Sequence, residues 1–288
     1  MSAASLIVAK SGSGTISVGS GGIVTAGSVQ VGSGGTVSLA GGLLDPVAAV
    51  TLAAGGTIAG FGTLEASLVD GGLVDASGGT LDLTGSVSGG GSLQLGAGST
   101  LQLDAAVGAT PTVTFASGTA TLILGNPGLN TSLFAEMTNI VVGDQIAFGS
   151  GTTITSLAYT PVAGGQDVVL DLIQDSTSGT ITLNDVQFAG GANQFEFANP
   201  VSGDALLEAA MCFCAGVHIA TPHGETPVEQ LAVGDRVVTL RGEARRIVWI
   251  GVGTVLATRG RRNAATPRRR SSCGRARSPT MCRTRICG

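Results

Sequence analysis

The chain has 288 residues and a formal net charge of −4; 43% of its residues are hydrophobic, 3% are aromatic and 47 are glycine. This hydrophobic share excludes a wholly disordered chain, because apolar surface is available to offset the entropy lost on ordering. The glycines follow no strict three-residue period, which excludes collagen. With so few aromatic side chains, a core must be filled by Val, Leu, Ile and Ala.

Charge and cysteine are distributed unevenly along the chain. Lys10 is the single basic residue before Arg236, and no acidic residue follows Glu243. All five cysteines stand at or after Cys212, so no disulfide can hold the first two hundred residues together. The cysteine spacings fit no usual zinc site, and we expect neither a metal nor another cofactor.

Nothing in the sequence predicts a membrane-spanning helix, because no run of about 18 apolar residues is present. The first residues, Met1–Lys10, lack the basic segment of a secretory signal peptide and carry too short an apolar stretch. Export would therefore need a signal that we do not recognise here.

The first 130 residues repeat one pattern, in which glycine and a small hydroxyl residue are followed by alternating apolar positions. Its copies begin at Gly14, Gly35, Gly56, Gly79, Gly98 and Gly118. Their starts lie 19 to 23 residues apart by subtraction. Each copy reads as a strand of three to five residues after a turn. Further glycine-initiated strands lie between the copies, for example Gly72–Asp75 and Ser92–Leu95.

Two or three short strands in each twenty residues, with glycine at the corners, predict one coil of a parallel β-solenoid, a β-helix. Inward Val, Leu and Ile would stack on the same position of the next coil, while Thr, Ser and Gln face water. A Gly/Ser-rich linker would not show this apolar alternation. An antiparallel sandwich could use similar strands, but the fixed period argues against it. We therefore predict an all-β fold, with solenoid repeats over residues 1–130.

Residues 131–205 keep the strands but lose the period. The segment Leu133–Met137 suggests a helical turn, and Ile140–Phe148 suggests a strand, a turn and a second strand. Later strands are expected at Asp167–Leu172, Gly179–Leu183 and Gln194–Phe197. Most of the phenylalanines lie here, as expected for a segment that caps the open end of the stack and protects its strand edges.

The repeats resemble the Gly/Thr-rich passenger regions of autotransporter-like and adhesin-like bacterial surface proteins. The resemblance covers about two thirds of the chain and rests on pattern rather than on a sharp motif. It implies an extracellular or cell-surface location and an unknown surface or extracellular ligand.

The sequence changes character at Cys212. A glycine follows four residues later, and then come Ile-Ala-Thr-Pro-x-Gly-Glu, Pro-Val-Glu-x-Leu and Val-Gly-Asp, ending at Asp235. Turns are expected at 222–225, 234–235 and 242–243, which predicts a compact β-meander over residues 212–253. This segment resembles the N-terminal part of a Hint (hedgehog/intein) domain of the bacterial branch.

The resemblance implies self-processing chemistry at the bond between Met211 and Cys212. In Hint domains the leading Cys thiolate attacks the preceding carbonyl and converts the amide into a thioester, so Cys212 is the candidate nucleophile. The family's general acid is a His in a Thr-x-x-His motif, which this sequence lacks. His218 and His223 lie too close to Cys212 for that role and are expected at the surface; Cys214 reads as a packing residue.

The Arg-rich tail, residues 254–288, does not continue the resemblance. Ten arginines without an acidic residue could bind nucleic acid, but the aromatic residues that stack on single strands are missing, so we do not favour nucleic acid as a partner. Moving GC-rich codons for Arg277–Cys287 by one base can produce a Hint-like peptide. We expect a tail that is disordered or read in a shifted frame, and hence an incomplete Hint domain.

Three functions therefore stay open. The first is a secreted or surface solenoid protein, structural or adhesive, with an impaired Hint segment, and the second is an active protein that cleaves itself once at Cys212. The third, a carbohydrate-active solenoid enzyme, would need clustered carboxylates on one face. Asp70, Asp75 and Asp82 come nearest to that, but we expect them at turns and in contact with solvent.

Overall fold

The computed structural model describes residues 2–116, 118–199, 205–210, 213, 216–239, 242–247, 249–251 and 285–287. The chain forms two compact units, Met1–Ala210 and Met211–Gly288. The described residues contain strands, turns and one short 3-10 helix, and among them no α-helix is found. None of them forms a helix with the length and apolar character that crossing a membrane would require.

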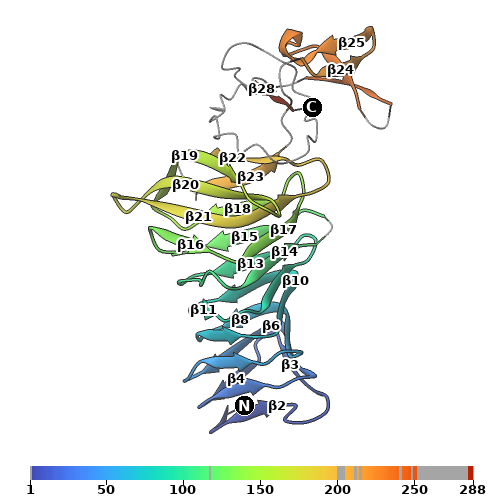
Figure 1. Ribbon diagram of the computed structural model, residues 1–288. Coiled ribbons are helices and arrows are strands. Elements are labelled where there is room, and N and C mark those ends of the chain that lie inside the picture. Colours follow the sequence, from blue (N-terminus) through green and yellow to red (C-terminus); the bar gives the residue numbers. More distant parts are fainter. Residues whose placement is uncertain are drawn as a thin grey trace. The chain divides into compact units, whose positions relative to one another are not determined.

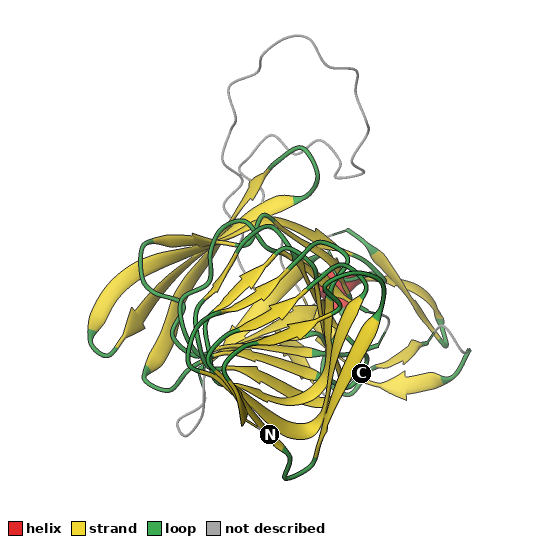
Figure 2. Ribbon diagram, turned by 90° about the horizontal axis from the view of Figure 1, so that it is seen from below, coloured by secondary structure: helices red, strands yellow, loops and turns green. Residues whose placement is uncertain are grey.

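The first unit is a parallel β-solenoid, as the sequence predicted, with three strand-bearing faces (Figures 1 and 2). The first face contains β3 (Gly14–Gly19), the first parts of β6 (Gly35–Pro46), β8 (Thr57–Leu64) and β10 (Leu73–Leu83), and β12 (Ser92–Leu95), β14 (Thr112–Phe115) and β17 (Glu136–Ile140). The second face contains β1 (Ser2–Ala3), β4 (Ile23–Ala26), the last parts of β6, β8 and β10, and β13 (Thr100–Leu103), β15 (Thr121–Leu124) and β18 (Gln145–Phe148). The third contains β2 (Leu6–Val8), β5 (Val29–Val31), β7 (Val50–Leu52), β9 (Leu68–Asp70) and β11 (Val87–Ser88).

Inward side chains form continuous apolar ladders, one residue per coil. On the second face each member pairs with the next in parallel register, and all are buried: Val24, Leu44, Leu64, Leu83, Leu103, Leu124 and Phe148. The first face repeats this arrangement with Val37, Ile58, Val74, Leu93, Val113 and Met137. Removing stacked apolar side chains from water stabilises a coil only when neighbouring coils are present.

The six copies of the sequence pattern do not form one column, which corrects the prediction. Thr57 pairs with Leu73, 16 residues on by subtraction, whereas Thr80 pairs with Thr100. Copies beginning at 14, 35 and 56 lie on the first face, and those at 79, 98 and 118 lie on the second. Both faces begin with glycine and a hydroxyl residue, so the pattern alone cannot tell them apart.

The long strands β6, β8 and β10 turn a corner between the first two faces, and Gly60 shows why glycine is needed there. Its φ is +109°, a conformation that L side chains rarely adopt. A Cβ at Gly60 would lie 2.0 Å from the carbonyl oxygen of Leu39 in the previous coil. With this backbone conformation, a side chain at position 60 would therefore collide with the previous coil.

The helical turn expected over Leu133–Met137 is wrong. The segment contains the end of β16 (Thr131–Leu133) and the start of β17 at Glu136. Between them Phe134 takes a φ of +62° and is buried. The amides of Phe134 and Ala135 donate to the carbonyls of Gly108 and Pro111 in the preceding coil, so their hydrogen bonds are not helical.

Antiparallel strands follow the last coil. They are β19 (Thr152–Pro161), β20 (Gln166–Gln174), β21 (Thr177–Phe188), β22 (Gln194–Ala198) and β23 (Leu206–Ala210), and they include the three later strands expected from sequence. Strand β21 also pairs in parallel with β16 and β17, and β23 pairs antiparallel with β18. The edges of the last coil are therefore occupied by strands of the same chain, which leaves them unavailable to other chains.

Candidate active site

In the second unit, the expected β-meander is replaced by three separate two-stranded antiparallel sheets among the described residues. Its strands are β24 (His218–Thr221), β25 (Gly224–Pro227), β26 (Arg236–Val238), β27 (Ala244–Arg246), β28 (Trp249–Gly251) and β29 (Arg285–Cys287), and the 3-10 helix η1 spans Val228–Gln230. β24 pairs with β25, β26 with β27 and β28 with β29, all antiparallel. Of the expected turns, the first is found at 222–223, because Gly224 and Glu225 already belong to β25. The second lies at 233–234 and the third is a bend at Gly242. Met211, Cys212 and Cys214 lie outside the described residues.

Three apolar side chains are buried among these small sheets. Val228 and Ile247 are fully buried, and Leu231 is nearly so. Backbone bonds connect the parts: the Val228 amide donates to the Val217 carbonyl at 2.8 Å, and the Ile247 amide donates to the Asp235 carbonyl at 2.7 Å. The Val-Gly-Asp turn is thereby fixed against Ile247, the residue directly after β27.

Glu229 connects the 3-10 helix to the chain just after Cys212. Its Oε2 accepts a hydrogen bond from the Gly216 amide at 2.8 Å. That bond, the Glu229 backbone amide and, more weakly, the positive charge of His218 lower the pKa of the Glu229 carboxyl group. Gly216 has a φ of +85°, which a side chain would disfavour. The glycine four residues after Cys212 is thus held in a bend by the glutamate of Pro-Val-Glu-x-Leu.

Both histidines are exposed, as the sequence predicted. His218 opens β24, and His223 lies in the β24–β25 turn. The turn is fixed by Thr221, whose Oγ1 donates to the Gly224 carbonyl at 2.6 Å and accepts from the His223 amide at 3.2 Å. The described structure therefore gives His223 a place in a turn, with no contact that marks it as a proton donor.

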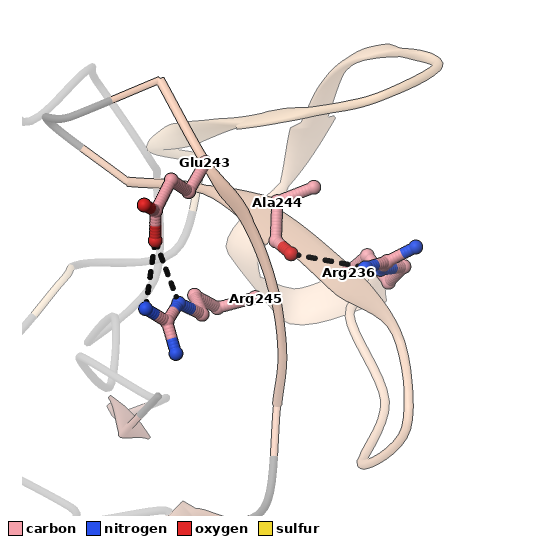
Figure 3. A network of polar contacts seen from close by, with 4 residues as sticks. All are labelled: Arg236, Glu243, Ala244 and Arg245. Atoms are coloured by element: carbon pink, nitrogen blue, oxygen red, sulfur yellow. Dashed lines mark hydrogen bonds and ion pairs between the residues drawn. The ribbon is translucent and has the colours of Figure 1, made fainter.

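The β26–β27 hairpin carries the first of the arginines (Figure 3). Arg236 donates through Nη2 to the Ala244 carbonyl at 3.1 Å, across the hairpin. Arg245 and Glu243 form an ion pair at 2.7 Å, but both side chains are more than half exposed. Solvent and salt screen such a pair, so it contributes little to stability.

Between Gly216 and Ile247, the described parts of these motifs are thus connected by hydrogen bonds. Residues 211–270 match the family model of the Hint domain. The match begins at Met211, directly before Cys212, and the Hint segment spans 60 of the 288 residues. It lies C-terminal to the repeats, as the resemblance implied. Comparisons with curated proteins and with solved structures found no match.

Sequence reasoning named the Hint motifs without assigning Gly216 and Glu229 a role. Their signal was present, because both belong to motifs at fixed distances from Cys212. What the sequence could not supply was the contact between them, which spans 13 residues.

The three carboxylates considered for a carbohydrate-active enzyme do not lie at solvated turns, as the sequence had suggested. Asp70 is fully buried at the end of β9, and Asp75 and Asp82 lie within β10, so none is a solvated turn residue. Burial, with smaller contributions from Asp104 and Glu65, raises the pKa of Asp82. Among the described residues, no cluster of His, Cys, Asp and Glu could hold a metal ion.

Proposed function

We propose that the chain is a secreted or cell-surface solenoid protein of bacterial, autotransporter-like type, joined to a self-processing Hint segment that acts at the Met211–Cys212 bond. The observation that carries the proposal is the position of the match: it starts at the residue before Cys212, where the solenoid unit ends. A processing domain placed there would release or transfer the whole solenoid.

The chemistry needs one thiolate and one proton donor. Cys212 Sγ would attack the carbonyl carbon of Met211, and the C–N bond would break as its nitrogen takes a proton, leaving a thioester and a free amine at Cys212. Water would then attack the thioester, giving a Met211 carboxylate and a Cys212 thiol. The Glu229–Gly216 bond supports the proposal because it restrains the chain four residues beyond the thiol.

A slow reaction is expected. The 288 residues contain no Thr-x-x-His motif to protonate the departing amine, and general acid catalysis of this kind typically contributes a factor of ~10²–10⁴. A shifted reading frame after residue 253 would explain the missing Thr-x-x-His motif, because it would remove the later Hint motifs from the protein. Sequencing the corresponding DNA tests that part of the proposal.

Intact-mass analysis of the purified protein tests the cleavage itself. We expect hydroxylamine, which intercepts thioesters, to yield a fragment ending in a Met211 hydroxamate and a fragment beginning at Cys212. Cys212→Ala should abolish both fragments, and Cys214→Ala should leave them unchanged.

A single intact mass after prolonged incubation with hydroxylamine would contradict self-cleavage. The structural or adhesive solenoid would then be the better account, since its support comes from the repeats and not from Cys212.

A further inference from the structure

Two irregular segments interrupt the regular surface of the solenoid beside the last coils of the second face. Here lies a cavity of about 540 Å³, within the range of small-ligand sites. Six polar side chains line this notch: Asp104, Asn126, Ser150, Gln174, Asp175 and Thr177.

The notch exists because a column of outward side chains on the second face gives way to glycine in the last coils. Each inward residue of the second-face ladder is followed by an outward residue, which is Asp45, Glu65, Thr84 and then Asp104 in successive coils. At the next two coils this position is Gly125 and Gly149. A Cβ at Gly149 would lie 2.2 Å from the Gly125 carbonyl oxygen, so stacking itself keeps this floor free of side chains.

The walls come from the two segments that break the repeat. One is the irregular stretch between β15 and β16, which contributes Asn126 and Leu129. The other is the β20–β21 hairpin, whose turn residues Asp175 and Ser176 have φ of +47° and +68°. Irregular segments held by a rigid scaffold are where binding residues concentrate in proteins.

The lining chemistry selects the ligand class. Asn126 and Gln174 offer both donors and acceptors, Ser150 and Thr177 offer hydroxyls, and the carboxylates of Asp104 and Asp175 only accept. No basic side chain lines the notch, which disfavours anions, and Leu129 is its one large apolar residue. A metal ion would use the acceptors alone, and no metal-binding cluster is found among the described residues.

We propose that this notch binds a neutral, hydroxyl-rich ligand, namely a short oligosaccharide. Each sugar hydroxyl both donates and accepts, which matches a lining of mixed amides, hydroxyls and carboxylates. Asp104 is already oriented, because its Oδ1 accepts from Gln102 Nε2 at 2.8 Å. The inference names a ligand class for the surface solenoid proposed above, and it involves no residue of the Hint segment.

Calorimetry and saturation-transfer NMR on the full chain, with maltotriose, cellotriose, mannotriose and triacetylchitotriose as probes, test the proposal. At least one probe should bind with Kd at or below ~1 mM. Asp175→Ala and Asn126→Ala, both at exposed positions, should each weaken binding severalfold. Ser150→Trp, which fills the notch from an exposed position, should abolish binding.

Asp45→Ala is the matched control, since Asp45 occupies the same outward column in a distant coil, and it should leave affinity unchanged. Failure of all four saccharides to bind would overturn the proposal, as would binding that Ser150→Trp leaves intact in a protein with unchanged thermal unfolding. Binding of Ca²⁺ or a cationic peptide without any saccharide would also overturn it. These outcomes are independent of the cleavage assay, so either proposal can fail without the other.

Discussion

Asp70 and Asp144 are fully buried carboxylates of the solenoid, and they differ in what their oxygens contact. Asp144 accepts backbone hydrogen bonds on both oxygens, from Ala120 at 2.8 Å and from Val141 at 2.7 Å, and so connects two coils. Asp70 accepts one, from Gly72 at 2.9 Å, while its Oδ2 has no protein partner. It continues the column of Val31 and Leu52 on the third face, so a carboxylate stands where the ladder has apolar residues.

Burial raises the pKa of Asp70 to about 6, against the smaller opposing effect of the Gly72 amide. Between the ordinary value of 3.8 and about 6, the folded chain therefore binds a proton that the unfolded chain does not. This group makes the free energy of unfolding rise as pH falls from 7 to 4, by roughly 1–3 kcal/mol. The sign is opposite to that of a carboxylate held in a salt bridge.

The substitution Asp70→Asn removes the ionisable carboxyl group and keeps the size and shape of the side chain. We expect the variant to be more stable than the wild type at pH 8 and to differ little from it at pH 4. Chemical denaturation at several pH values measures this. An unchanged pH dependence in the variant would show that Asp70 is not the responsible group, leaving Asp82 and Asp144, whose pKa values burial also raises.

Within a strand, inward and outward side chains contribute very differently to the free energy of unfolding. In β13, Leu103 is buried and belongs to the second-face ladder, whereas Thr100 is only partly buried and its side chain lies on the outward side. Because the coil above and below cannot collapse into a gap, removing a ladder side chain leaves a cavity.

Leu103→Ala should therefore lower the free energy of unfolding by about 2–5 kcal/mol. Thr100→Ala in the same strand should change it by less than about 0.5 kcal/mol. Urea denaturation of both variants gives the comparison. Equal effects would contradict the assignment of the two faces of β13.

The alternation within strands and the glycine at corners were readable from sequence because each follows from local chemistry. The register between strands was not, since Gly56-Thr57 and Gly79-Thr80 look alike and yet lie on different faces. The segment after Leu133 was misread for a related reason: Phe134 gains its hydrogen bond from a residue 26 positions earlier by subtraction, a contact that no local pattern encodes.

The same limit applies to the site. Cys212 could be proposed from its motif alone, but the Glu229–Gly216 contact and the notch beside Asp175 depend on chain segments brought together by folding. Burial of Asp70 was missed because an Asp before two glycines is typical of a solvated turn.

At the scale of the whole molecule, the chain forms two compact units, of which the first is the solenoid and the second contains the Hint segment. Everything assigned to the first unit, from the notch to the buried carboxylates, depends on which coil residues are neighbours. That register is the central structural claim.

Engineered cysteine pairs test the register most directly, in a chain whose five native cysteines are replaced by serine. Neighbouring parallel strands place paired Cα atoms about 5 Å apart, within the range that a disulfide spans. Thr57→Cys with Leu73→Cys should form an intrachain disulfide on mild oxidation, because the two residues are paired. Thr57→Cys with Thr80→Cys, which the sequence repeat alone would align, should stay reduced; the reverse result would contradict the solenoid as described.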